Sequence, residues 1–224
     1  MKNAKWLSII VSLALLLFSN QYIFAQDHSK EFIKTIMQGN VKEVEKYIEK
    51  GVDVNFSSNK RHTPLMYAIW GGHLDIVKLL ISKGANVNMR TERGGAALNV
   101  AASKGDQVIC HYLLGKGADI ESKDNEGKTP LMNAVYNKKR DSVKYFIEKN
   151  ADVNAKEPNG WSALMFATML GEAESVQLLI KAGADVNSKT KDGETALQRA
   201  EKLEKAKLAD MKEIIKVLRE SGAK

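Results

Sequence analysis

The chain contains very little cysteine and proline. Its 224 residues include one cysteine, Cys110, and three prolines. A single thiol cannot form an internal disulfide, and no cysteine stands near the N-terminus to carry a lipid anchor. The scarcity of proline and an apolar content of 44% argue against extended disorder. We therefore expect a folded domain without internal disulfides.

Motifs for catalysis and for cofactor binding are also missing. No G-x-G-x-x-G or G-K-[ST] phosphate loop is present, and the carboxylates are spread along polar faces rather than paired. None of the four histidines has a second one at metal-site spacing on the same helix. We expect no enzyme activity, no cofactor and no metal. The alternative, an enzyme with an unfamiliar site, would need a strongly shifted titratable group in a closed pocket.

The N-terminal 25 residues differ from the rest of the chain. Lys2 and Lys5 precede an apolar run from Trp6 to Phe18, and the segment ends in the small residue Ala25. This pattern is typical of a secretory signal peptide that is cleaved after Ala25. The run of about 13 residues is shorter than the roughly 20 needed to span a bilayer, so a retained anchor is the less favoured alternative. We expect an exported protein of bacterial origin, periplasmic or secreted, with no membrane insertion after cleavage.

The net charge gives no indication of nucleic-acid binding. Cleavage would remove two lysines and no acid, so the charge of +7 would become +5. The remaining excess is dispersed along the chain, which favours solubility and, mildly, acidic partners.

The dominant pattern is a repeat of 33 residues. A leucine recurs at this spacing and an alanine follows it three residues later: Leu65/Ala68, Leu98/Ala101, Leu131/Ala134, Leu164/Ala167 and Leu197/Ala200. A polar residue recurs at the same spacing: Asn55, Asn88, Glu121, Asn154 and Asn187. Such a period predicts a stack of small units, each of which buries its apolar face against its neighbours.

One unit illustrates the expected local structure. Apolar residues at helical spacing predict one helix over Ser162–Leu170 and a second over Ala173–Lys181. Gly183 ends the second helix, since a left-handed residue costs least for glycine. A short loop then leads into the next unit.

These residues resemble the ankyrin repeat. Thr63-Pro64-Leu65 and Thr129-Pro130-Leu131 match its T-P-L signature, Gly71–Leu80 matches the start of its second helix, and Gly183–Asn187 matches its closing segment. The resemblance covers about residues 30 to 224. It implies an all-α ankyrin-repeat solenoid of stacked helix–turn–helix units with short hairpin-like turns, whose turn tips and first helices line a concave groove.

The repeat pattern predicts the domain organisation. We expect a signal peptide at 1–25 and an ankyrin repeat domain at 26–224. Within the domain we expect a partial cap repeat at 26–58, full repeats at 59–91, 92–124, 125–157 and 158–190, and a cap repeat at 191–224. The last repeat has six extra residues, which lengthen either its first helix or the following link, and Ile215 and Leu218 should continue its core.

Several positions depart from the pattern. Cys110 stands where other repeats have valine, so we expect a buried, inert thiol. Arg61 replaces the glycine of the other turns, which predicts a different or strained first turn. Lys138 and Asn150 replace two helix-ending glycines, so the third repeat is expected to be looser.

The resemblance implies that variable residues on the turns and at the ends of first helices contact partners. Carried over by position, this gives a set of aromatic, apolar and basic residues: His62, Trp70, Arg90, Arg93, Lys104, Lys123, Tyr136, Lys156, Trp161, Met169 and Leu170. Aromatic anchors among basic residues are typical of protein-binding hot spots. The alternative is that the large residues pack against neighbouring turns and that the basic ones are simply solvated.

The function predicted from sequence is a monomeric, non-catalytic interaction module. It would bind another protein, and not nucleic acid, through the concave groove and the turn tips. The alternative is a structural or stress-protective envelope protein without one specific partner.

Overall fold

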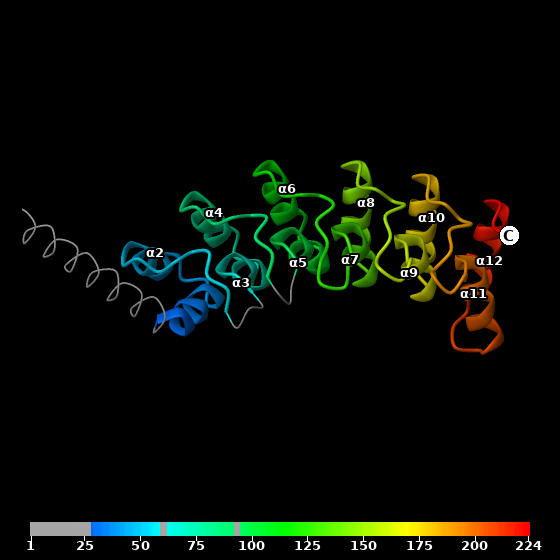
Figure 1. Cartoon of the computed structure of the whole chain (residues 1–224), viewed down its shortest axis with the longest axis horizontal. Coiled ribbons are helices and arrows are strands. Elements are labelled where there is room, and N and C mark those ends of the chain that lie inside the picture. Colours follow the sequence, from blue (N-terminus) through cyan, green and yellow to red (C-terminus); the bar gives the residue numbers. More distant parts are fainter. Residues whose placement is uncertain (1–27, 59–61, 92–94) are drawn as a thin grey trace, which may run out of the picture. The chain divides into compact units, whose positions relative to one another are not determined.

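The computed structural model describes residues 28–58, 62–91 and 95–224, which form helices joined by short turns (Figure 1). The predicted leader, Arg61 and Arg93 lie outside these ranges. Within them, the prediction of an all-α chain of helix–turn–helix units is confirmed. No described helix is both long and apolar enough to cross a bilayer. The chain divides into two compact units, Met1–Asn86 (unit 1) and Val87–Lys224 (unit 2).

Unit 1 contains a helix over residues 28–37, then α2 (Val41–Glu49), α3 (Pro64–Gly71) and α4 (Leu74–Ser82). Helix α4 packs against both α2 and α3. Its largest fully buried side chains include Phe32 and Ile36 of the first helix and Leu80 of α4.

Unit 2 contains four helix pairs that follow one another in a row (Figure 1). The pairs are α5 (Ala97–Lys104) with α6 (Gln107–Gly115), α7 (Pro130–Tyr136) with α8 (Arg140–Glu148), α9 (Ala163–Met169) with α10 (Ala173–Lys181), and α11 (Ala196–Lys205) with α12 (Lys212–Glu220). First helices contact the first helices of neighbouring pairs, and second helices contact second helices. The two helices predicted in the fourth repeat are therefore confirmed.

The helix ends follow from local chemistry. The Thr129 hydroxyl accepts a hydrogen bond from the Met132 amide at 3.3 Å, and Pro130 occupies the first turn, where it loses no hydrogen bond. Thr63 and Pro64 repeat this arrangement in unit 1. Gly183 ends α10 with φ of +90°, as predicted from its position.

The recurring alanines all lie in the core. Each is fully buried, with 0% exposure: Ala68, Ala101, Ala134, Ala167 and Ala200. A larger side chain would have to displace a neighbouring helix at these positions, because protein cores are close-packed. Leu131 and Leu164, which precede two of them, are 1% exposed.

The recurring asparagines tie each repeat to the next. Asn154 Oδ1 accepts from the Asp185 amide at 2.8 Å, and its Nδ2 donates to the Gly183 carbonyl at 3.1 Å. The same pair of bonds is formed by Asn55, Asn88 and Asn187. We call this series the asparagine ladder. It satisfies backbone groups at the end of each second helix that would otherwise need water or another cap.

Glu121 is the exception in the ladder. Its Oε1 accepts from the Asp152 amide at 2.8 Å, but a carboxylate has no N–H to donate to the Asn150 carbonyl. Burial, followed by the nearby carboxylates of Asp152 and Asp119, raises the pKa of Glu121 above its usual range.

The six extra residues near the C-terminus are divided between helix and link. Helix α11 has ten residues where α9 has seven, and residues 206–211 link α11 to α12 where residues 170–172 link α9 to α10. Leu218 is fully buried as predicted, but the prediction for Ile215 is wrong. Met211 and Ile214 fill the core, while Ile215 is half-buried because no described helix follows α12 to cover it.

The other departures from the pattern are accommodated locally. Cys110 is fully buried, as predicted, and burial raises the pKa of its thiol to about 12, so it carries almost no reactive thiolate at neutral pH. Lys138 and Asn150 adopt the left-handed conformation of the glycines that they replace, with φ of +55° and +61°. Whether the third repeat is looser stays a prediction.

Candidate functional site

Two turns of unit 2 are held in shape by buried or half-buried carboxylates. Asp124 Oδ1 accepts from the amides of Glu126 and Lys128, both at 2.9 Å. Glu157 Oε1 does the same for Asn159 and Trp161, also at 2.9 Å. These bonds fix the backbone at the last residue of each turn. They therefore place Lys128 and Trp161 directly before helices α7 and α9.

The aromatic side chains of unit 2 pack into one cluster. Phe166, on α9, meets Tyr136 of α7 edge to face, with ring centroids 5.9 Å apart and planes at 89°. It also lies 5.2 Å from Trp161, with planes tilted by 32°. Edge-to-face and offset pairs at such distances are favourable. Residues from two successive repeats thus form a continuous apolar surface.

Cations cover the ring faces at both ends of this cluster. Lys128 Nζ lies 4.1 Å from the centroid of the Tyr136 ring, and the Arg199 guanidinium lies 5.1 Å from that of Trp161. We call Lys128, Tyr136, Trp161, Phe166 and Arg199 the aromatic–cation strip. Both contacts are within the range of cation–π attraction.

Acidic residues hold the two cations in place. The Lys128 side chain is only 7% exposed and pairs with Glu126 at 2.7 Å. Glu194, itself 13% exposed, pairs with Arg199 at 2.5 Å and with Lys202 at 2.8 Å. The strip is therefore a preorganised surface, since its rings and cations are already held by intramolecular contacts.

The structure separates the predicted apolar site residues by exposure. Tyr136 is the most accessible of those in unit 2, with 45% exposure, whereas Trp161, Met169 and Leu170 are half-buried. The Leu170 carbonyl accepts a hydrogen bond from Lys138 Nζ at 3.3 Å. Trp161 packs against Phe166 and Arg199 and is therefore part of the strip, and its role in partner binding stays a prediction.

Unit 1 contains a second, smaller aromatic cluster. The His62 ring lies 4.2 Å from that of Trp70, and Tyr67 lies 5.8 Å from Trp70. The Tyr67 and Ser58 hydroxyls are 2.8 Å apart. Trp70 remains 39% exposed. The predicted residues His62 and Trp70 are therefore neighbours.

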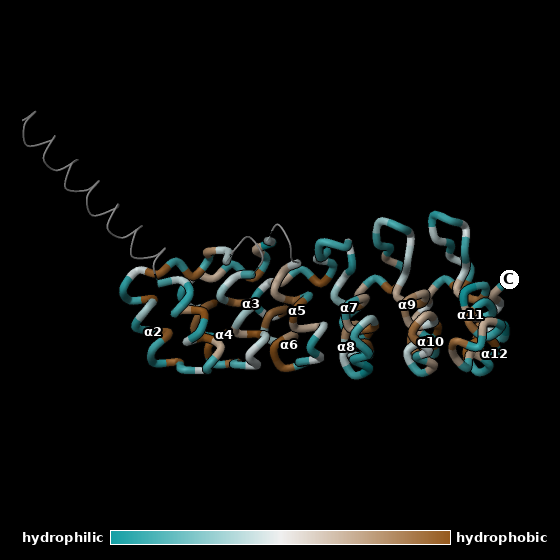
Figure 2. Tube along the Cα trace, turned by 90° about the horizontal axis from the view of Figure 1, so that it is seen from below, coloured by the Kyte–Doolittle hydropathy of each residue, from teal (hydrophilic) through white to brown (hydrophobic). Residues whose placement is uncertain are grey.

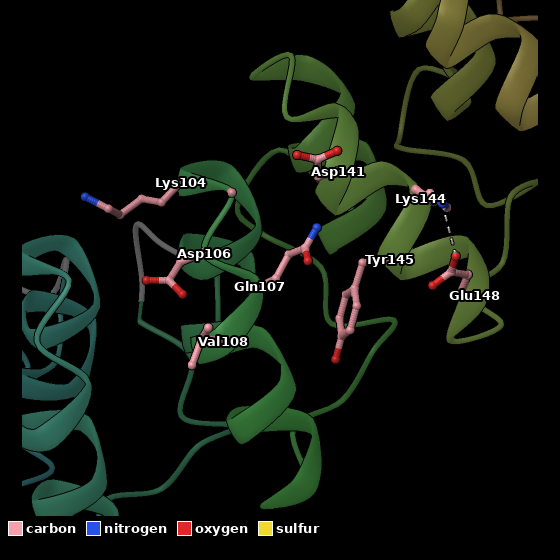
Figure 3. Close-up of a pocket in the computed structure, with 9 residues that line it drawn as sticks. Lys104, Asp106, Gln107, Val108, Asp141, Lys144, Tyr145 and Glu148 are labelled. Atoms are coloured by element: carbon pink, nitrogen blue, oxygen red, sulfur yellow. Dashed lines mark ion pairs between the residues drawn. The ribbon is translucent and has the colours of Figure 1, made fainter.

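The predicted basic residues within the described ranges lie on the surface. Arg90, Lys104, Lys123 and Lys156 are all exposed. Lys123 Nζ contacts the Lys156 carbonyl at 3.5 Å, and Lys156 Nζ contacts the Lys189 carbonyl at 3.3 Å. Lys104 lies elsewhere, at a shallow hollow beside α6 and α8 (Figure 3).

That hollow has mixed chemistry. Asp106, Asp141, Lys144 and the exposed Val108 line it, and Tyr145 extends from α8 toward α6 (Figure 3). The Tyr145 hydroxyl is buried without a hydrogen-bond partner, and burial raises its pKa. Across the described residues, no group of three or more His, Cys, Asp or Glu side chains is placed to hold a metal ion.

Sequence reasoning missed Phe166 and Arg199 as site residues and gave Lys128 no special weight. Phe166 and Arg199 share one repeat position in the middle of the first helix, together with Tyr67, Val100 and Asn133. This position changes from aromatic to aliphatic to polar between repeats, which was the available signal. The predicted site did not include this position because the family resemblance pointed only to the turns and the ends of the first helices.

Comparison with known proteins identifies the fold family. The family model for ankyrin repeats (three copies) matches residues 13–91, 88–157 and 131–224. The chain is also similar to the crystal structure of the ankyrin repeat domain of Bcl-3, a member of the IκB protein family. The two are 27% identical, with a TM-score of 0.74 and 86% of each chain covered. The search of curated proteins found no significant match. With the caps, buried alanines and asparagine ladder described above, these matches show that the chain belongs to the ankyrin repeat family, whose members typically mediate protein–protein interaction.

Proposed function

We propose that the protein is an exported, non-catalytic module that binds another protein through the aromatic–cation strip and adjoining turns of unit 2. The observation that carries the proposal is the strip itself. Three aromatic rings from two repeats pack together with two buried or half-buried cations, yet Tyr136 keeps 45% of its surface exposed. A rigid aromatic surface of this kind binds a partner at a low cost in side-chain entropy.

Affinity capture from the native envelope fraction, followed by mass spectrometry, tests this proposal. We expect one dominant partner, which is lost when Tyr136 and Trp161 are both changed to alanine. The matched control is Tyr112→Ala, which removes an aromatic ring from the second helix α6 and should keep the partner. A separate Trp70→Ala variant measures the contribution of unit 1.

Two results would contradict the proposal. Retention of the partner by the Tyr136/Trp161 double variant would show that the strip is not the binding surface. Capture of no stoichiometric partner would favour the alternative of a general structural or stress-protective envelope protein. Circular dichroism of each variant is needed to show that the helices remain folded.

Export rests on the sequence pattern of residues 1–25, and it has its own test. Mass spectrometry of the protein recovered from cell fractions should give a mature N-terminus at Gln26, in the periplasm or the medium. An intact N-terminus in the membrane fraction would indicate a retained anchor. We also propose that the mature protein is a monomer, which light scattering coupled to size-exclusion chromatography would measure.

A further inference from the structure

The turn that precedes α9 contains an asparagine followed by a glycine. Asn159-Gly160 is the only such pair in the sequence. Asn159 is exposed, and the turns that precede α9 and α11 project from the helices as largely hydrophilic loops (Figure 2). Because glycine has no Cβ, its backbone nitrogen is open to attack on the side-chain carbonyl carbon of the preceding asparagine. This attack begins spontaneous deamidation, so the pair is a candidate modification site.

The fold itself requires the glycine of this pair. Gly160 has φ of +86°, in the left-handed region that favours glycine. A Cβ added to Gly160 would lie 3.0 Å from both the Lys191 amide nitrogen and Thr190 Cα, which belong to the next turn. The close approach of the two turns therefore keeps the reactive pair in the chain.

The side chain of Asn159 is held more weakly than those of the asparagine ladder. Within the described residues it makes one hydrogen bond, from Nδ2 to Glu157 Oε2 at 3.3 Å, which is longer than most N–H···O bonds. Asn187 also precedes a small residue, Ser188, but its amide is bonded at both ends, to the Gly222 carbonyl and the Lys224 amide. Asn159 is therefore the freer of the two to turn toward the following nitrogen.

The reaction needs the turn to open locally. The Gly160 amide donates to the Glu157 carbonyl at 2.9 Å, and this bond must break before the nitrogen can attack. Opening an exposed turn costs much less free energy than unfolding the whole repeat domain. The folded protein can therefore reach the reactive conformation while its helices stay packed.

We propose that Asn159 deamidates spontaneously in the folded protein and that the change loosens the turn before Trp161. The Gly160 nitrogen loses its proton to solvent and bonds to Asn159 Cγ, and the Cγ–Nδ2 bond breaks, so that Nδ2 takes up a proton and leaves as ammonia. Water then opens the cyclic succinimide. Cleavage of the new Cγ–N bond gives aspartate, whereas cleavage of the original peptide bond gives isoaspartate. The net reaction consumes one water and releases one ammonia.

The two products should affect the turn differently. Aspartate places a second carboxylate beside Glu157, whose Oε1 holds the Asn159 and Trp161 amides at 2.9 Å. The equivalent positions of the neighbouring repeats already carry carboxylates, Glu126 and Asp192, so this product fits the fold. Isoaspartate adds one carbon to the main chain. The turn then no longer matches the spacing of its bonds to Glu157 and to the Lys191 amide, which donates to the Asn159 carbonyl at 2.8 Å.

The first experiment incubates the full chain in mildly alkaline buffer and follows its tryptic peptides by mass spectrometry. Peptide 157–181 contains Asn159 as its one asparagine, and peptide 182–189 contains Asn187 as an internal reference. We expect 157–181 to convert first, with isoaspartate detected by enzymatic methylation. The native rate should be slower than the rate in concentrated urea by about thirtyfold or less, because opening the turn breaks one or two hydrogen bonds.

The Asn159→Gln variant is the matched control. It keeps an amide beside Glu157 but would have to close a larger ring, so peptide 157–181 of this variant should stay unmodified. Conversion of the parent peptide no faster than that of 182–189 would overturn the proposal. So would a native rate far below the thirtyfold limit, because the reaction would then require unfolding.

The second experiment measures amide hydrogen exchange in the two products after their separation by ion exchange. In the isoaspartyl form we expect the Trp161 and Lys191 amides to exchange about fivefold faster, which corresponds to the loss of one net hydrogen bond. In the aspartyl form, and in Asn159→Asp, only Trp161 should exchange faster. Unchanged exchange in the isoaspartyl form would refute the loosening of the turn. Neither experiment uses a partner, so this inference can fail or stand independently of the proposed function.

Discussion

The third repeat (α7 and α8) and the fourth repeat (α9 and α10) form the same helix pair with different residues at the two helix ends. The fourth repeat ends its helices with Gly171 and Gly183, at φ of +71° and +90°. The third ends them with Lys138 and Asn150 in the same left-handed region. Asn154 links the third repeat to the fourth with two hydrogen bonds, whereas Glu121 links the second to the third with one.

The comparison shows that the fold tolerates a non-glycine residue at a left-handed position, or a glutamate in place of a ladder asparagine, at a local cost in free energy. The helices of the third repeat form normally because capping and core packing suffice. The strain and the missing hydrogen bond remain, so the junction at Glu121 should be weaker than that at Asn154. In a repeat protein such differences stay local, because stability is a sum of unit and interface contributions.

The largest effect is expected from breaking the stronger junction. Asn154→Ala removes both ladder bonds to the fourth repeat and should lower the free energy of unfolding by about 2 kcal/mol. Glu121→Ala removes one bond and a half-buried charge, so it should cost less. Urea denaturation followed by circular dichroism measures both. An equal loss for the two variants would contradict the comparison.

The weaker junction can also be repaired. Glu121→Asn restores an amide that can accept from the Asp152 amide and donate to the Asn150 carbonyl, and it should raise the free energy of unfolding by about 1 kcal/mol. Amide hydrogen exchange should show the gain mainly in α7 and α8. Glu121→Gln is the control, because its longer side chain is neutral but misplaces the amide.

Backbone strain at Lys138 is the next difference. Lys138→Gly should stabilise the protein by about 1 kcal/mol, since glycine adopts the left-handed conformation without a steric penalty. Lys138→Ala keeps the strain and loses the ion pair with Glu172, so it should not stabilise. Conversely, Gly171→Ala should destabilise the fourth repeat, even though its added Cβ would lie 3.8 Å from Met211 Cε. Thermal and urea unfolding of the three variants provide the measurement.

The smallest effect is a dependence on pH. The folded state raises the pKa of Glu121, so it binds this proton more tightly than the unfolded state does. This contribution to stability is complete below the unfolded pKa of about 4.5 and disappears as pH rises through the folded pKa. The free energy of unfolding relative to Glu121→Gln should therefore fall as pH rises above about 4.5 and through the folded pKa. A rise over this range would show that the assigned direction is wrong.

The repeats could be predicted from the sequence because the residues that begin and end their helices act through local contacts. Thr129, Pro130 and Gly183 each fix a helix end through contacts with residues a few positions away. The burial of Cys110 followed from its position alone. The strip was only partly predictable, because the contacts of Phe166 with Tyr136 and of Arg199 with Trp161 join different repeats and depend on side-chain direction. Ile215 was mispredicted because position in the repeat does not say whether another helix covers it.

The asparagine ladder has a consequence for how such a chain can change in length. Each ladder side chain belongs to one repeat, and the backbone groups that it binds lie 29 and 31 residues further on in the internal repeats. Deletion or duplication of one whole repeat brings an equivalent side chain to equivalent backbone groups, so the new junction closes with the same bonds. Gene rearrangements in steps of one repeat can therefore alter the number of repeats while each new junction forms the same kind of bonds as the junction that it replaces.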